Sequence, residues 1–482
     1  MRLMLLLKHL LSPADNFCLV SKLFLKLLAI IYFFAFLSMA VQITGLVGPN
    51  GILPFEISLN NFYQQHGVSA WFKMPTLFWF SASNLALHTV TILGCVFSVL
   101  LLLGRWQRLS LVALFVLYLS LYHAGQTFLN FQWDTLLLEV GFLAIFLVSG
   151  PSHLLIFLFH FLLFRLRFMS GVSKLATEDP SWSGLKALNY YFETQPLPHV
   201  GSWYFHQLPD WLLKTGTGFT FFTELIIPFF IFLPRRFRLI AAGVTITMQL
   251  LIISTSNHNF INLLTILLCL FLLDDKFIQR FKSAPVKLPI FKINKLNSVF
   301  LVITGTAILA ASLSFFYSML SAQRMPVWME KTSLLVRFYG LGHVYHVFPI
   351  MQTERHELQV EGSYDQVNWK AYTFKYKPND EAMRPQFIVP HQPRLDWMIW
   401  FVPPKYSDQM NWFKLFLRRL NEGSPEVLAL LEYNPFKNNP PPYLRVMVYR
   451  YQFTNFEERK LTGNWWKQEL LGEFPYVKAR KP

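Results

Sequence analysis

The sequence is poor in cysteine and has no site for N-linked glycosylation. Its 482 residues include three cysteines, Cys18, Cys95 and Cys269, each in or beside an apolar stretch. Three thiols cannot form a disulfide framework, and the lack of a Cys-x-x-Cys pair argues against direct thiol–disulfide chemistry. No Asn-x-Ser/Thr sequon occurs. This absence favours a bacterial inner membrane over a glycosylating endoplasmic reticulum.

Charged residues are scarce, and acidic ones especially so. Only 15% of the residues are charged, against about 25% in a typical soluble protein. Hydrophobic residues make up 53%, with 49 Phe, which excludes a soluble enzyme, a disordered chain and a coiled coil. The 43 Lys and Arg exceed the 27 Asp and Glu, giving a net charge of +16. Because the basic clusters lie between apolar runs, we expect membrane lipids as partners and no nucleic acid.

The signatures of soluble enzymes are missing. The sequence has no Gly-x-Ser-x-Gly elbow, no P-loop and no dinucleotide-binding fingerprint. His356-Glu357 begins like the zinc motif His-Glu-x-x-His, but Val360 stands where the second His is needed. We therefore expect no metal and no cofactor. A membrane-embedded enzyme is still compatible with the sequence.

Nine apolar runs are candidate membrane spans, each near the length of about 20 residues that a span needs. They are residues 26–47, 84–103, 109–124, 134–150, 151–167, 218–234, 238–254, 258–273 and 297–319. Only Gly150-Pro151-Ser152 separates the fourth from the fifth, so these two form either one broken helix or a tight hairpin. We predict about seven to nine spans. The first run fits an uncleaved anchor better than a signal peptide cleaved after Ala40.

Positive charge in short loops predicts the orientation of the chain, because such loops stay in the cytoplasm. Basic residues cluster in four places: before residue 27, at Arg105 and Arg108, at 235–238, and at 276–295. With nine spans, residues 321–482 lie outside the cytoplasm, as do two long loops at 48–83 and 168–217. One conflict remains, because Arg165, Arg167 and Lys174 then face outward.

The chain changes character near Arg324, where charges become frequent and alternation replaces apolar runs. Alternating segments predict strands at 356–361, 369–376 and 443–453, and short helices at 412–420 and 426–431. The predicted architecture is an α-helical multi-pass membrane bundle over residues 1–320. A β-rich soluble domain follows over 321–482.

Six polar residues in apolar surroundings are candidates for catalysis. Asp134 and Glu139 enter one apolar run, and a spacing of five puts them about 140° apart on a helix. Either Asp134 caps the helix while Glu139 pairs with an Arg or a backbone donor, or both line a polar cavity. The other four candidates are Glu193, His199, Glu224 and His258.

The arrangement of these six residues discriminates between two functions. Convergence on one cavity with perturbed ionisation would favour an enzyme, whereas dispersed pairs would favour a scaffold. Glu224 is predicted to face the bundle with a polar partner. Glu193 and His199 can equally have structural roles in an aromatic loop.

A compact segment in the tail, 387–397, is the candidate for client binding. Its candidate contacts are His391, Arg394, Asp396 and Trp397. Exposed aromatic and Arg side chains are favoured at protein interfaces, and Trp397 offers an anchor. The alternative is structural: Arg394 pairs with Asp396 across a turn, and Trp397 packs beneath the loop.

Several blocks of consecutive residues resemble the lipase maturation factor family. They are Asn130–Glu139, Tyr191–Pro198, Pro390–Trp397, Glu422–Pro425, Asn434–Phe436 and Tyr449–Thr454. The resemblance covers the chain from about residue 60 to about residue 470. The membrane part is also distantly similar to the transmembrane domain of the vitamin K-dependent carboxylase, from which no catalytic residue is carried over.

The resemblance implies a multi-pass protein with a soluble lumenal domain. Animal members of the family reside in the endoplasmic reticulum membrane and help secreted lipases fold and assemble into active dimers. Few cysteines and no sequons suit a bacterial member. We therefore expect a chaperone-like, non-enzymatic maturation factor whose partner is an exported client protein such as a lipase. The alternative is a membrane-embedded enzyme of carboxylase-like fold that acts on a lipid or an exported substrate.

Overall fold

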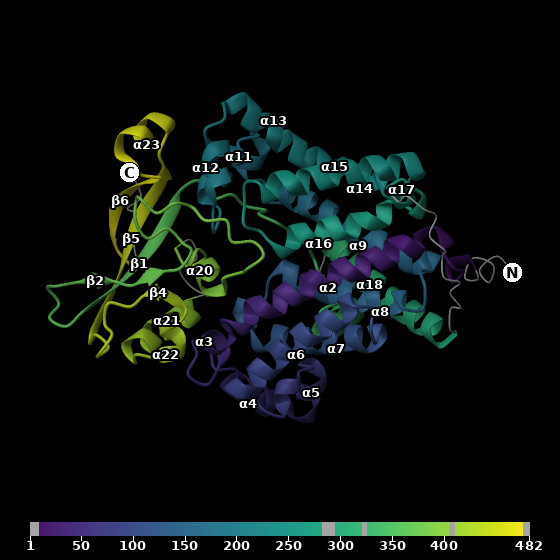
Figure 1. The fold of residues 1–482 in the computed structure, drawn as a ribbon, viewed down its shortest axis with the longest axis horizontal. Helices are drawn as coiled ribbons and strands as arrows, with labels where there is room; N and C mark the ends of the chain where they lie inside the picture. The colour runs from purple at the N-terminus through teal and green to yellow at the C-terminus, as the bar shows by residue number, and fades with distance from the viewer. Residues whose placement is uncertain (1–8, 282–294, 321–324, 404–409, 476–482) are drawn as a thin grey trace.

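The structure, a computed structural model, describes residues 9–281, 295–320, 325–403 and 410–475. Helices form an elongated bundle, and the strands lie at one end of it, opposite the end where α2 begins (Figure 1). One apolar core runs from the bundle into the C-terminal part, where it includes Leu358, Trp397 and Val446. The C-terminal part therefore packs directly on the membrane helices.

All nine predicted apolar runs are helical. The helices are α2 (Cys18–Ala40), α6 (Asn84–Leu102), α7 (Gln107–Ala124), α8 (Gln132–Leu147), α9 (His153–Ala176), α13 to α14 (Asp210–Phe221 and Ile227–Phe230), α15 (Arg235–Ile253), α16 (Phe260–Cys269) and α18 (Lys295–Leu320). Among the described residues, six helices are long and apolar enough to cross a membrane: α2, α6, α7, α9, α15 and α18. The predicted count of seven to nine is therefore not confirmed. Helices α8 and α16 are shorter, and a π-helical turn separates α13 from α14.

Helices α8 and α9 form a tight hairpin rather than one broken helix. Gly150 in the turn has a φ of 101°, which favours glycine. Ser152 caps α9 by accepting a hydrogen bond from the Leu155 amide at 3.3 Å. Glu139 of α8 then meets Arg165 of α9 across the hairpin.

Short basic segments gather at the end of the bundle where α2 begins. Arg108 contacts Ser149 in the α8–α9 turn, and Arg235 pairs with Asp274. Beside them, α17 (Asp275–Gln279) binds the start of α2, because the carboxylate of Asp275 accepts the Leu19 amide at 2.9 Å. Arg165, Arg167 and Lys174, which conflicted with the predicted orientation, are buried in the bundle. They are therefore not part of a basic loop.

Short helices occupy both predicted loops. The first loop holds α4 (Phe55–His66) and α5 (Ala70–Lys73), after α3 (Ile43–Val47). The second holds α10 (Pro180–Ser183), α11 (Ala187–Thr194) and α12 (Val200–His206). This loop begins later than predicted, because α9 continues to Ala176, where buried Lys174 is held by an ion pair.

The C-terminal part contains a small antiparallel sheet in the order β2-β1-β5-β6. Its strands are β1 (Arg355–Ser363), β2 (Lys370–Ala371), β5 (Tyr443–Phe453) and β6 (Trp466–Glu473). Leu358 pairs with Val448 and Val360 with Val446, so buried side chains share a face. Two of the predicted strands are confirmed. The third, at 369–376, is divided between β2 and β3 (Thr373–Phe374), which pairs with β4 (Leu431–Tyr433) in a second sheet.

Helices make up much of the remainder, so the C-terminal part is less β-rich than predicted. They are α19 (Val327–Phe338), α20 (Arg394–Ile399), α21 (Met410–Asn421), α22 (Pro425–Leu428) and α23 (Phe456–Thr462). Two of them, α21 and α22, begin within the predicted helical segments or next to them. The division into domains at residue 320 stays a prediction.

Candidate functional site: buried ion pairs in the bundle and at its contact with the C-terminal part

Asp134 in the first turn of α8 forms a two-pronged ion pair with Arg394 of α20. The two guanidinium nitrogens lie 2.7 and 2.8 Å from the two carboxylate oxygens, and both side chains are buried. Tyr118 donates a hydrogen bond to the same carboxylate at 2.7 Å. Paired hydrogen bonds of this kind combine strength with a fixed geometry. The pair therefore fixes α20 on the bundle.

These contacts correct two predictions. Asp134 does not cap α8, because Arg394 and Tyr118 occupy its carboxylate. Arg394 does not pair with Asp396, because residues two apart on a helix point in different directions. Asp396 instead accepts the amides of Tyr376 and Lys377 at 2.8 and 3.1 Å. Burial raises the pKa of the Asp396 carboxyl above its usual value, against the lowering effect of these amides.

The segment predicted to be an exposed client-binding loop is mostly buried. Trp397 is 3% exposed and packs edge-on against Trp133, with ring centroids 5.2 Å apart. His391 is partly exposed, and its ring nitrogen lies 3.0 Å from the Ser38 hydroxyl of α2. The expected exposure was wrong, and the structural alternative holds for Trp397. This segment anchors the C-terminal part to α2 and α8.

Glu139 links three parts of the chain. It pairs with Arg165 of α9, accepts the Tyr345 hydroxyl at 3.2 Å and accepts the Gly342 amide at 3.1 Å. Pairing with an Arg was one predicted alternative, and it is confirmed. Asp134 and Glu139 contact different neighbours, as their angular separation on α8 predicted.

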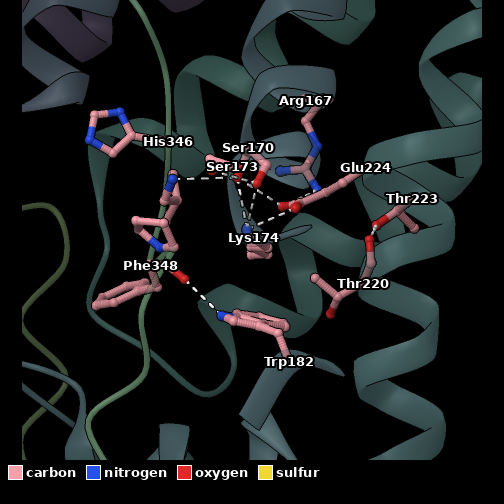
Figure 2. A network of polar contacts seen from close by, with 12 residues as sticks. Arg167, Ser170, Ser173, Lys174, Trp182, Thr220, Thr223, Glu224, His346 and Phe348 are labelled. Carbon is pink, nitrogen blue, oxygen red and sulfur yellow. Dashed lines mark hydrogen bonds and ion pairs between the residues drawn. The ribbon is translucent and has the colours of Figure 1, made fainter. Parts of the chain in front are cut away.

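Glu224 lies at the centre of a polar network inside the bundle (Figure 2). Its carboxylate lies 2.8 Å from the Lys174 ammonium and 3.3 Å from the Arg167 guanidinium. The Ser170 hydroxyl donates to it at 3.2 Å. All these side chains are buried. The prediction that Glu224 faces the bundle with a polar partner is confirmed.

Local backbone features bring Glu224 close to α9. Pro228 has no amide to donate to the preceding turn, and residues 222–226 widen into a π-helix around Glu224. On α9, Gly171 has no side chain, and a Cβ there would lie 2.9 Å from the Glu224 Cβ. The two helices therefore approach closely enough for the carboxylate to reach Ser170 and Lys174.

The remaining three candidates, Glu193, His199 and His258, make hydrogen bonds in or to the short helices α11 and α12. Glu193 accepts the Phe453 amide of β5 at 2.6 Å, and the imidazole of His206 lies 3.7 Å away. Burial raises the pKa of Glu193 and lowers the pKa of His206 to about 4. His199 caps α12 by accepting the Gly201 amide at 2.9 Å. His258 lies 2.5 Å from the Tyr191 hydroxyl.

Sequence reasoning missed the buried cations that hold these carboxylates. Arg165 and Lys174 stand in an apolar helix, and charge in such a place calls for a partner. Arg355 of β1 was also missed. It pairs with Glu357 and donates to the carbonyls of Glu193 at 2.9 Å and Pro196 at 3.0 Å. No local signal in the sequence identifies Arg355, since an Arg is common at the start of a strand with alternating polar and apolar residues.

The six predicted residues do not converge on one cavity. Asp134, Glu139 and Glu224 each bind a different cation, and the other three hold backbone or a tyrosine hydroxyl. Within the described residues, no group of three His, Cys, Asp or Glu is placed to hold a metal ion. Dispersed pairs of this kind fix segments of the chain to one another.

Comparisons with known proteins give the same family for both the membrane part and the C-terminal part of the chain. The family model described as lipase maturation factor transmembrane domain matches residues 19–280, and lipase maturation factor C-terminal domain matches residues 341–476. Lipase maturation factor 2 of Xenopus laevis is 34% identical, with 92% of this chain and 80% of that protein covered. The human protein of that name is 31% identical over 96% of this chain and 83% of its own length.

Relatives of a second name match the chain at a slightly lower identity. Lipase maturation factor 1 of Mus musculus is 31% identical, with 96% of this chain and 89% of that protein covered. No solved structure matches the chain. Two family models and relatives of this identity over nearly the whole length lead to one conclusion: the chain is a multi-pass membrane protein that belongs to the lipase maturation factor family.

Proposed function

We propose that this chain is a membrane-anchored maturation factor that assists exported client proteins, lipases among them. The observation that carries the proposal is the similarity to proteins named lipase maturation factor over more than nine-tenths of the chain. A maturation factor needs a rigid support on which a client can be held. The buried ion pairs supply such a support, because two of them join helices of the bundle and the third fixes α20 to it.

The C-terminal part is proposed to lie on the non-cytoplasmic side of the membrane. Basic segments gather at the opposite end of the bundle, which suits the cytoplasmic side. Arg165, Arg167 and Lys174 do not oppose this orientation, because they are buried in ion pairs rather than in a loop. The lack of sequons supports a bacterial inner membrane as the location.

The client platform is proposed on the exposed surface around the sheet end rather than on the buried residues of 394–397. Exposed large side chains of the C-terminal part include Ile350, Tyr364 and Phe387. Aromatic side chains that are already exposed offer binding area without unfolding the anchor beneath them. Phe387 is the first choice, because its neighbour Ile388 is held by Asn257 through a 3.1 Å hydrogen bond.

Site-specific crosslinking tests this proposal. A photoreactive amino acid replaces Phe387 in the full chain, which is expressed together with an exported lipase. We expect a crosslinked adduct with the lipase. Trp106, exposed at the opposite end of the bundle, is the matched control position and should give none. An adduct only at position 106, or equal adducts at both positions, would contradict the platform and the orientation.

One observation favours the enzymatic alternative, a membrane-embedded enzyme acting on a lipid or an exported substrate. Glu193 and His206 are neighbours whose pKa values are shifted by burial in opposite directions. Shifts of this kind occur at catalytic sites as well as in structural pairs. Glu193→Gln keeps the acceptor for the Phe453 amide. An enzyme that uses this carboxyl would lose client maturation in that variant, whereas a scaffold would retain it.

A further inference from the structure

Helix α19 and the turn after it return into the helical bundle. The chain leaves α18, and α19 packs back along it. At the end of α19, Gly340 lies against Leu138 of α8, and Gly342 lies against Ala311 of α18. Their φ values of 71° and 64° favour glycine. Glu139, which binds this turn, is about two helical turns, or about 10 Å, inside α8.

The irregular backbone after α19 is satisfied by the bundle. Glu139 accepts the Gly342 amide at 3.1 Å, and Gln132 accepts the His346 amide at 3.0 Å. Ser170 accepts the Val347 amide at 3.4 Å. Irregular backbone at membrane depth is tolerated only where protein or water satisfies it. The hydrogen bonds to the bundle therefore suit a re-entrant segment over residues 327–349.

Charges in this region do not balance. Four cations, Arg165, Arg167, Lys174 and Arg337, face two carboxylates, Glu139 and Glu224. The carboxylates are both taken by the first three cations. Arg337 is half-buried, and within the described residues its side chain makes no hydrogen bond or ion pair. An uncompensated charge beside lipid is costly, so an external anion would stabilise this one.

A second polar group without a partner lies beside Arg337. The Nε2 atom of His343 is buried and has no hydrogen-bond partner in the part of the chain that the structure describes. The imidazole lies within electrostatic range of Arg337 and Arg165, and its ring centroid is 6.4 Å from that of Tyr122. The imidazole is a polar neighbour of Arg337, and the donors that an oxyanion would need come from the guanidinium.

The exposed face of α19 suggests where that anion comes from. Trp328, Leu334 and Leu335 are exposed along this helix, and Arg337 lies at the edge of their stripe. Helical side chains lean toward the N-terminal end of their helix. In α19 that end is where the chain leaves α18. The guanidinium is therefore expected to lean from the turn after α19 toward the end where the chain leaves α18.

We propose that Arg337, with His343 beside it, binds the phosphate of an anionic phospholipid in the leaflet on the side of the C-terminal part. The planar guanidinium matches phosphate oxygens with two parallel hydrogen bonds. The acyl chains would lie along the exposed leucines of α19. Inorganic phosphate shares the headgroup chemistry but has nothing to place on that apolar stripe.

The test uses the purified full chain in nanodiscs of phosphatidylglycerol or of phosphatidylcholine. Lipid retention after delipidation is measured by native mass spectrometry, and Tm is measured in parallel. We expect retained phosphatidylglycerol and a higher Tm in its nanodiscs. Arg337→Gln should weaken phosphatidylglycerol binding about fivefold, the effect of one cation near an anionic surface. Arg337→Lys should lose less.

Arg418→Gln, which removes an exposed Arg of α21, is the matched control and should bind as the wild type does. Equal retention of phosphatidylglycerol by Arg337→Gln and by the wild type would overturn the proposal. If inorganic phosphate raised Tm in phosphatidylcholine nanodiscs as much as phosphatidylglycerol does, the bound phosphate would not have to come from a lipid, and the proposal would be overturned. If Arg337→Gln does not fold, the wild type and Arg337→Lys decide, since loss of any preference for phosphatidylglycerol in both would also contradict it.

Discussion

Two Arg–carboxylate pairs in this molecule have the same length and very different surroundings. Arg394 lies 2.7 Å from Asp134 between the bundle and the C-terminal part, and Arg418 lies 2.7 Å from Glu422 on the surface of α21. The first two side chains are 1% and 0% exposed, the second two 71% and 38%. Solvent screens the exposed pair, which is worth about 0–1 kcal/mol. Burial, and not distance, decides which pairs hold the fold.

The largest difference between the two kinds of pair is expected at Glu224. Glu224→Leu leaves Lys174 and Arg167 buried without an anion, and we expect a loss of about 5 kcal/mol, at the upper end for a broken buried pair. The free energy of unfolding in mixed micelles measures it. Glu422→Leu is the control on the exposed side. An equal effect of the two substitutions would contradict the distinction.

A smaller loss is expected when the cation is removed instead. Arg394→Met leaves Asp134 buried, but a carboxyl group can take up a proton and become neutral, so we expect about 3 kcal/mol. The same unfolding measurement applies, with Arg418→Met as the control at about 1 kcal/mol or less. Protease cleavage near residue 390 should increase in Arg394→Met. No increase would mean that this pair does not hold α20 in place.

Two glycines, Gly171 and Gly218, allow the effect of close packing near Glu224 to be compared with that of an open position. A Cβ at Gly171 would lie 2.7 Å from a Leu225 methyl group and 2.9 Å from the Glu224 Cβ, whereas nothing lies within 4 Å at Gly218. Gly171→Ala should cost about 1–3 kcal/mol by overpacking. Gly218→Ala should stabilise its helix by about 0.5–1 kcal/mol. A loss in Gly218→Ala as large as that in Gly171→Ala would show that the close approach is unimportant.

Acid should weaken the contact between the C-terminal part and α2. Burial, with smaller effects of Arg394 and Lys375, lowers the pKa of His391 to about 4 from an ordinary 6.5. The folded state therefore favours the neutral ring. The stability it contributes is present above about pH 6.5 and is lost as the pH falls toward 4. Tm measured over this window should fall less in His391→Gln than in the wild type. If Tm depended on pH in the same way in His391→Gln and in the wild type, His391 would not be the cause of the loss of stability in acid.

The sequence predicts the helices better than the contacts between them. Apolar runs and strand alternation are local signals, and all nine runs are helical. Helix α19 was missed because Glu330, Lys331 and Arg337 interrupt its hydrophobic pattern. The strand at 369–376 was predicted whole because alternation does not show which sheet each half joins.

Partners of buried charges depend on distant parts of the chain. Asp134 and Arg394 are 260 residues apart in sequence, and nothing local connects them. The nearby Asp396 was therefore the natural but wrong partner. Glu224 was easier, because a carboxylate within an apolar run must face a polar group wherever that group lies in the sequence.

The pair of Asp134 and Arg394 is expected to position the C-terminal part on the bundle rather than to take part in catalysis. The double variant Asp134→Leu, Arg394→Met tests it, because apolar residues of similar volume can replace a buried ion pair without loss of stability. The measurement is the yield of active exported lipase per folded copy of this protein in co-expressing cells. We predict a yield close to that of the wild type. A double variant that folds as stably as the wild type but yields no active lipase would show that the pair has a role beyond positioning.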